Sequence, residues 1–171
     1  MSTTVISYSL TGNNRALAES VAKELSAEHI KIKEVKSRTM GSIVMDVIFN
    51  KIPQVQPMPD SIKECDLIVL FGPVWMGKVA TPLRSYLKHL KDRPRRYAFI
   101  SISGGADGSN PGLAGELKKR TGKDPAVLLD LHITELLPSS PKPARKDTSA
   151  YRLKPDDIVK LTDKIMKALS S

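Results

Sequence analysis

The sequence predicts an α/β domain built on a parallel sheet with helices on both faces. Short apolar segments alternate with longer amphipathic ones along the 171 residues, which is typical of a doubly wound sheet. The segment at residues 67–71 is apolar without alternation, as a strand covered on both faces should be. No internal repeat and no linker divides the chain, so we treat residues 1–171 as a single domain with one core.

Five strands are expected, at residues 5–8, 30–35, 67–71, 99–102 and 126–129. The strand at 30–35 alternates apolar and polar residues, which indicates that one of its faces is more solvated. Two stretches do not fit the strand–helix alternation. The stretch at 38–60 holds a short helical segment at 43–49 and then a proline-rich link. The stretch at 136–154 is basic and is expected to be an excursion before the final helix.

Helices are expected between the strands. Residues 13–28 place Leu17, Val21 and Leu25 on one face of a helix. Thr81 and Asn110 each precede a proline, so both are expected to be N-caps with proline as the first helical residue. The last helix is expected to begin near residue 155, with an acidic first turn. The residues expected to be buried on the later helices are Leu83, Leu87, Leu90, Leu113, Leu117, Ile158, Leu161, Ile165 and Leu169.

The composition narrows the function classes. Hydrophobic residues make up 40% of the chain and charged residues 26%, as in ordinary globular proteins. The single cysteine, Cys65, excludes a disulfide framework, and the three histidines are widely separated, so no metal is expected. The N-terminal residues lack a basic segment followed by an apolar run, and no apolar run is long enough to span a bilayer. We therefore expect a cytoplasmic protein without membrane insertion.

The net charge of +9 favours anionic ligands or acidic partners. The basic residues concentrate near 88–96, 118–120 and 142–146, at expected helix ends and in loops, where the helix dipole favours cations. No cluster of aromatic stacking residues accompanies these runs, which argues against nucleic acid as a partner.

A loop rich in hydrogen-bond donors follows the first strand. The first N–H groups of a helix have no internal partner, and the helix dipole places partial positive charge there. The loop contains neither Gly-x-x-x-x-Gly-Lys nor Gly-x-Gly-x-x-Gly, so neither common nucleotide fingerprint is present. Taken alone, it fits either a phosphate site or a capped helix start. Its residues are Ser9, Leu10, Thr11, Gly12, Asn13 and Asn14.

This loop resembles the phosphate-binding loop of the flavodoxin family, which has Ser-x-Thr-Gly-Asn after its first strand. Two further loops, after the third and fourth strands, are similar to the family's flavin loops. Trp75 stands where the family places an aromatic ring against the flavin. The resemblance covers nearly the whole chain and implies a five-stranded parallel sheet of order 2-1-3-4-5 with FMN as cofactor. In the two further loops it assigns to FMN the residues Pro73, Val74, Trp75, Met76, Gly77, Ser103, Gly104, Gly105, Asp107 and Gly108.

The chain departs from the family pattern in three ways. Asn14 stands where the family often has a hydroxyl residue. No aromatic residue lies between Ser103 and Pro111, where many electron-carrying flavodoxins have a tyrosine over the outer flavin face. Tyr151 is the aromatic residue that could fold back over that face. The chain is also basic, whereas electron-carrying flavodoxins are typically acidic.

The resemblance leaves two functional classes and a weaker third. The first is an FMN-dependent oxidoreductase that takes hydride from NAD(P)H and passes electrons to a small acceptor such as a quinone. Because the cofactor carries this chemistry, no catalytic residue is named. The second is a non-enzymatic electron carrier that docks on a partner reductase. The third, a flavin-free module that contacts nucleic acid, is disfavoured by the missing aromatic cluster. A homodimer is left open.

Overall fold

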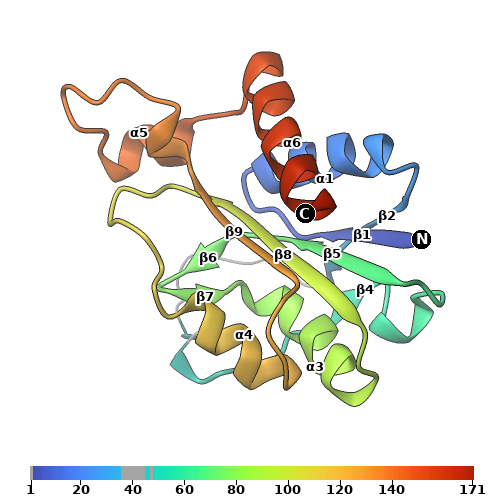
Figure 1. The fold of residues 1–171 in the computed structure, drawn as a ribbon. Coiled ribbons are helices and arrows are strands. Elements are labelled where there is room, and N and C mark those ends of the chain that lie inside the picture. The colour runs from blue at the N-terminus through green and yellow to red at the C-terminus, as the bar shows by residue number, and fades with distance from the viewer. Residues whose placement is uncertain (1, 36–44, 47) are drawn as a thin grey trace.

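The computed structural model describes residues 2–35, 45–46 and 48–171. Its centre is a five-stranded, entirely parallel sheet of order β2-β1-β5-β8-β9 (Figure 1). The predicted sheet and its 2-1-3-4-5 order are therefore confirmed. The strands are β1 (Thr3–Ser7), β2 (Glu28–Lys31), β5 (Leu67–Phe71), β8 (Arg96–Ser103) and β9 (Val127–His132).

Helices cover both faces of the sheet. On one face, α1 (Asn13–Glu24) packs against α6 (Pro155–Ser170), and on the other, α3 (Arg84–Asp92) packs against α4 (Leu113–Thr121) (Figure 1). Alternate residues of each strand enter the two cores. Val69 and Ile100 belong to the core between the sheet and the helices α1 and α6. Leu70 and Phe99 belong to the core between the sheet and the helices α3 and α4. Burial on both faces explains why β5 is apolar throughout.

The helix stripes predicted from the sequence are largely confirmed. Leu83, Leu87, Leu90, Leu113, Leu117, Leu161 and Ile165 are buried, while Ile158 and Leu169 pack against the core and are only partly buried. Among the described residues, no helix is both long and apolar enough to cross a membrane.

The first helix is shorter than the predicted 13–28. Ser26 adopts a left-handed backbone with φ of 50°, and the Ala27 N–H bonds back to the Ala22 carbonyl at 2.8 Å. This backbone reversal closes the helix. The chain is then free to enter β2 at Glu28.

The strand predicted at 30–35 divides into two. Ile30 and Ile32 are buried, and the Ile32 N–H still bonds to the last residue of β1, Ser7, at 2.8 Å. Because β1 ends there, the following residues have no neighbour in the main sheet. They form β3 (Lys33–Glu34), which pairs with β4 (Val55–Gln56) in a separate antiparallel ribbon.

Both predicted N-caps are wrong. Thr81 lies inside a 3₁₀ turn, η2 (Thr81–Leu83), and its buried hydroxyl has no hydrogen-bond partner among the described residues. Asn110 lies three residues before the first residue of α4, and its side chain bonds to Asp130 of β9 instead. For Asn110, a tertiary partner competes with the helix end that local preference would favour.

The two irregular stretches are partly resolved into elements. Of the helix predicted at 43–49, residues 43, 44 and 47 lie outside the described residues, and Met45, Asp46 and Ile48 are helical. The proline-rich link after it contains a 3₁₀ turn, η1 (Pro59–Ser61). The excursion at 136–154 follows the turn η3 (Ile133–Glu135) and contains a short helix, α5 (Arg145–Ala150).

A pair of glycine substitutions tests this packing. A Cβ at Gly72, just after β5, would lie 2.2 Å from Cδ1 of the fully buried Leu83. We expect Gly72→Ala to destabilise the fold by about 1–3 kcal/mol, because Leu83 must leave its position in a filled core. Gly115 lies inside α4 with open space around a Cβ, so Gly115→Ala should stabilise the fold by about 0.5–1 kcal/mol. Urea unfolding of both variants measures the two changes, and a Gly72→Ala protein as stable as Gly115→Ala would contradict the described core.

Candidate functional site

Three loops meet at the carboxyl edge of the sheet, where doubly wound proteins bind their ligands. They follow β1, β5 and β8, and each contributes to one cavity of about 250 Å³. The first loop supplies Leu10, Thr11 and Asn14, and the lining is completed by the other two loops and by α5. The predicted residues in this lining are Leu10, Thr11, Asn14, Pro73, Val74, Trp75, Ser103 and Gly104.

Asn14 joins the first loop to the third. Its amide Nδ2 donates to the Ile102 carbonyl at 2.8 Å, and its Oδ1 accepts from the Ile102 N–H at 3.0 Å. The Asn14 side chain is buried. Ile102 lies two residues past Ile100, which is the last β8 residue that pairs with β5, so β5 offers no partner to its peptide groups. The amide thus takes the place of a neighbouring strand, and it fixes the start of α1 against β8. The hydroxyl-to-amide change noted in the sequence therefore has a structural role.

Asn13 makes an equivalent pair of bonds to the segment before α6. Its Nδ2 donates to the Tyr151 carbonyl at 3.0 Å, and its Oδ1 accepts from the Leu153 N–H at 3.1 Å. The sequence suggested that the amides of Asn13 and Asn14 donate to a phosphate, and this part of the interpretation is corrected, since both amides bind peptide groups. Neither Asn13, Ser9 nor Gly12 lines the described cavities.

Backbone donors of the first loop are nevertheless available. The Ser9 hydroxyl accepts from the Gly12 N–H at 2.9 Å, and Gly12 takes a φ of 96° that favours glycine. Within the described chain, the N–H groups of Leu10, Thr11, Asn13 and Asn14 have no hydrogen-bond partner. These N–H groups surround the positive end of the α1 dipole, which is the arrangement that binds anions at helix starts.

Trp75 belongs to a hairpin of β6 (Val74–Trp75) and β7 (Lys78–Val79). The turn between these strands uses left-handed backbone at Met76 and Gly77, with φ of 51° and 72°. The indole meets the Tyr8 ring edge to face, with 5.8 Å between ring centroids. The indole is half-buried against the core and also lines the cavity. The contact of Trp75 with a flavin, which the sequence predicts, stays a prediction.

The glycines of the third loop are required by packing. A Cβ at Gly104 would lie 2.8 Å from the Thr148 hydroxyl of α5, and one at Gly105 would lie 2.5 Å from Cβ of His132. Gly105 also has a φ of 75°. From the sequence, these glycines are expected to let the backbone approach a ligand closely. In the structure, α5 and the end of β9 fill the space beside them.

Asp130 anchors the far end of the third loop. Its carboxylate accepts from the Asn110 backbone N–H at 3.2 Å and from the Asn110 amide at 3.0 Å. His132 Nε2 lies 3.2 Å from the same carboxylate. Sequence reasoning did not single out Asp130, because one aspartate inside an apolar strand carries no motif. The strand predicted at 126–129 ends before Asp130, whereas β9 runs on to His132, so the signal lay just past the predicted strand.

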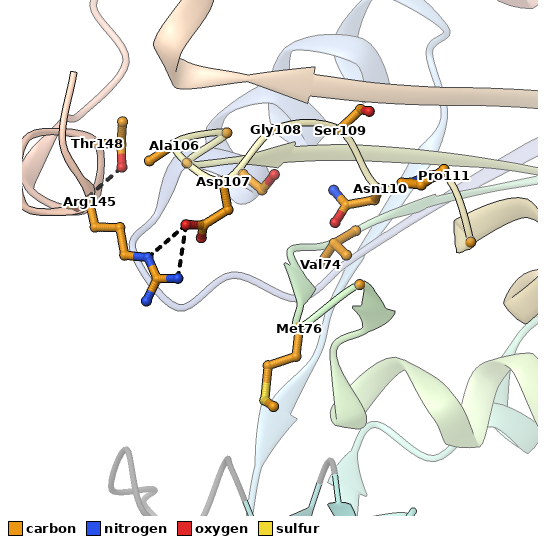
Figure 2. Close-up of a pocket in the computed structure, with 15 residues that line it drawn as sticks. Val74, Met76, Ala106, Asp107, Gly108, Ser109, Asn110, Pro111, Arg145 and Thr148 are labelled. Carbon is orange, nitrogen blue, oxygen red and sulfur yellow. Dashed lines mark hydrogen bonds and ion pairs between the residues drawn. The ribbon is translucent and has the colours of Figure 1, made fainter. Parts of the chain in front are cut away.

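A second cavity of about 550 Å³ opens beyond the third loop and shares Val74, Ser103 and Gly104 with the first (Figure 2). It contains the other predicted loop residues, namely Met76, Gly77, Gly105, Asp107 and Gly108. From the opposite side come Arg145 and Thr148 of α5, which sequence reasoning missed because the excursion shows no periodicity.

Arg145 spans the second cavity toward the third loop. Its Nε donates to Asp107 Oδ1 at 3.0 Å, and Nη2 lies 2.8 Å from the same oxygen (Figure 2). Hydrogen bonding to Asp107 raises the pKa of Arg145 further above its already high value. Both side chains are largely exposed, so the ion pair contributes little stability and opens easily.

Tyr151 does not cover this region. Its hydroxyl donates to Asp157 Oδ2 at 2.6 Å at the start of α6, and this bond raises the pKa of Tyr151 to about 12. The same bond lowers the pKa of Asp157. The ring packs against the core under α1 and α6, away from both cavities. No group of three or more His, Cys, Asp or Glu side chains within the described residues could hold a metal ion.

Solved structures share this architecture, although no protein-family model and no curated protein matches the sequence. A flavoprotein of Lactobacillus acidophilus, crystallised in complex with FMN, is 21% identical with a TM-score of 0.62, over 75% of this chain and 92% of its own. A candidate flavoprotein of Bacteroides eggerthii is 14% identical with a TM-score of 0.65, over 97% of this chain and 99% of its own. The chain has the flavodoxin-like fold.

A candidate flavoprotein of Bacteroides uniformis agrees, with 17% identity and a TM-score of 0.64 over 76% of this chain and 88% of its own. At such identities the likeness concerns the fold alone. Within the flavodoxin-like fold, the three loops described above stand at the ends of the first, third and fourth strands in chain order of the main sheet, as the sequence predicted.

The Asn14 clamp gives a stability test. Asn14→Ala leaves the N–H and the carbonyl of Ile102 unpaired at a buried position, so we expect a loss of about 2–4 kcal/mol. Gln54→Ala, which removes an exposed amide, is the control and should change the stability by less than about 0.5 kcal/mol. Urea unfolding measures both, and equal midpoints for the two variants would show that the Asn14 bonds are not what holds the loops together.

Proposed function

We propose that the chain is an FMN-binding redox protein, and more narrowly an oxidoreductase that moves electrons from NAD(P)H to a small acceptor such as a quinone. The observation that carries this proposal is the cavity shared by the three loops. It brings unpaired backbone donors, an aromatic ring and the third loop together at the carboxyl edge of a flavodoxin-like sheet.

The phosphate end of FMN fits the first loop. The free N–H groups of Thr11 and Asn13 and the hydroxyls of Ser9 and Thr11 are neutral donors at the positive end of α1. No carboxylate lines the smaller cavity, so a dianion meets no like charge there. The role of the asparagine side chains is to hold this loop in place rather than to contact the phosphate.

The ring system of FMN fits between the second and third loops. Trp75 and Val74 form one side of the smaller cavity, and Ser103 and Gly104 form another. Thr148 and Ser149 of α5 also line this cavity. Bound there, FMN would supply the redox chemistry, and this chain's residues would bind and orient it.

The enzyme is favoured over a carrier by the open second cavity. Among the described residues no aromatic side chain lines it, and Tyr151 is held elsewhere, so a planar substrate has access to the flavin region. In the net reaction the nicotinamide loses a hydride, and the quinone gains two electrons and two protons, one of the protons coming from water. The net charge of +9 favours the second candidate, an electron carrier that docks on an acidic reductase.

The phosphate contact is tested by comparing FMN with riboflavin, which lacks the phosphate. Thr11→Glu places a carboxylate where the phosphate is proposed, so FMN affinity should fall by at least about tenfold, whereas riboflavin affinity changes little. Thr3→Glu puts the same charge at the start of β1, at the opposite edge of the sheet from the first loop, and serves as the control. Flavin fluorescence titration measures all three proteins. Equal FMN affinity in the Thr11→Glu and control proteins would exclude this loop as the phosphate site.

Trp75 provides a direct optical report, since it is the only tryptophan in the chain. We expect FMN to quench the indole emission as it binds, with one FMN per chain at saturation. Trp75→Phe should retain most of the affinity, and Trp75→Ala should lose it by about tenfold, as about 1–3 kcal/mol of base-type stacking is removed. If the indole emission stays constant while FMN binds, Trp75 does not contact the flavin and its role is structural only.

Turnover separates the two functional candidates. The FMN-loaded protein should oxidise NAD(P)H in the presence of a quinone without any partner protein. A rate no higher than that of free FMN would contradict the oxidoreductase. Reduction only through a separate reductase, with a rate that falls as salt is added, would establish the carrier.

A further inference from the structure

A third cavity, of about 890 Å³, lies between α3 and α4, and six of the fourteen residues that line it are basic. We call it the α3–α4 groove. Its size falls within the range of small-molecule sites, roughly 300–1,000 Å³. Two acidic side chains, Asp92 and Glu116, also line it. The basic side chains in the lining are Lys78, Arg84, Lys88, Lys91, Lys119 and Arg120.

Half of these cations already have partners. Lys88 Nζ lies 2.6 Å from Asp92 Oδ2, and Arg120 Nε donates to Glu116 Oε1 at 2.8 Å. Glu116 also accepts from the Val79 N–H at 2.6 Å, so its carboxylate is held on two sides.

The third partnered cation is the buried Arg84, which donates to the carbonyls of Asp46 and Lys51. The two acidic side chains of the groove, Asp92 and Glu116, are neutralised by Lys88 and Arg120.

Three lysines form no ion pair in the part of the chain that the structure describes. They are Lys78 at the hairpin, Lys91 on α3 and Lys119 on α4. All three side chains are exposed and reach the groove from different elements. Like charges held around a concave surface repel one another, and a multivalent anion between them relieves that repulsion.

The groove is continuous with the proposed flavin region. Met76, Gly77 and Gly112 line both the groove and the 550 Å³ cavity beside the third loop. A Cβ at Gly77, Gly112 or Gly115 would meet no atom within 4 Å, so glycine leaves this passage open. A ligand with a flat head in the cavity can therefore extend its anionic end toward the lysines.

We propose that the α3–α4 groove binds the phosphorylated adenosine end of NADPH, and that the three lysines favour NADPH over NADH. This rests on the proposed function, because the nicotinamide end would then lie at the flavin. The 2′-phosphate, which distinguishes NADPH from NADH, adds up to two negative charges, and lysine binds phosphate as a point charge. A concave groove suits a small polyanion better than the broad face of an acidic protein does.

The test uses adenosine 2′,5′-bisphosphate and 5′-AMP as probes, titrated by calorimetry into the protein with and without FMN. The bisphosphate should bind at least tenfold more tightly than 5′-AMP. Lys91→Glu combined with Lys119→Glu should remove most of that difference. Lys164→Glu combined with Lys167→Glu changes the net charge equally on exposed positions of α6, across the sheet, and should preserve the difference. Circular dichroism verifies that both double variants are folded.

The outcomes distinguish this proposal from the proposed function. A bisphosphate that does not bind, or that both double variants weaken equally, overturns the groove. The groove proposal is also overturned if the Lys91→Glu, Lys119→Glu protein keeps its bisphosphate affinity but is reduced more slowly by an acidic reductase. That result would indicate that the groove docks a protein. Preferential bisphosphate binding to a protein that fails to bind FMN supports the groove and contradicts the proposed function alone. If FMN-loaded protein turns over, the groove variant should raise KM for NADPH at least tenfold more than KM for NADH, and equal changes overturn the groove.

Discussion

The candidate site depends on one pair of hydrogen bonds, between the buried amide of Asn14 and the peptide groups of Ile102. Parallel strands separate at the carboxyl edge of a twisted sheet, so loops there need cross-links to keep a fixed spacing. An asparagine amide presents the same donor and acceptor as a peptide group, and it can therefore bind a strand end as another strand would. Here it holds the anion-binding start of α1 against the third loop, and the smaller cavity lies between them.

A second layer of contacts builds on this link. Asn13 ties the segment at residues 151–153 to the same helix start, and this brings α5 over the third loop. Thr148 then packs where a side chain at Gly104 would stand. The opposite face of the sheet carries the basic α3–α4 groove, which joins the larger cavity at the Met76–Gly77 turn. We thus propose that the FMN phosphate binds at the start of α1, on one face of the sheet, and that the adenosine end of NADPH binds in the α3–α4 groove on the other face.

Much of the fold could be predicted because hydrophobic periodicity depends on local sequence. The strand at 67–71 and the stripe Leu83, Leu87, Leu90 were predicted correctly for that reason. The roles of Asn13 and Asn14 could not be predicted, because an amide that binds phosphate and one that binds a peptide group look alike in sequence. Asn110 was misplaced as an N-cap because Asp130, twenty residues away, competes for its side chain. Arg145 was missed because only the folded excursion brings it to the site.

The most direct test of the account is a crystal structure of the protein with FMN. We expect the phosphate to accept hydrogen bonds from backbone N–H groups between Leu10 and Asn14. The ring system should lie against Trp75, beside Ser103 and Gly104, while the Asn14–Ile102 bonds stay intact. FMN found elsewhere on the protein, or a phosphate contacted through the Asn13 and Asn14 amides with those bonds broken, would contradict it.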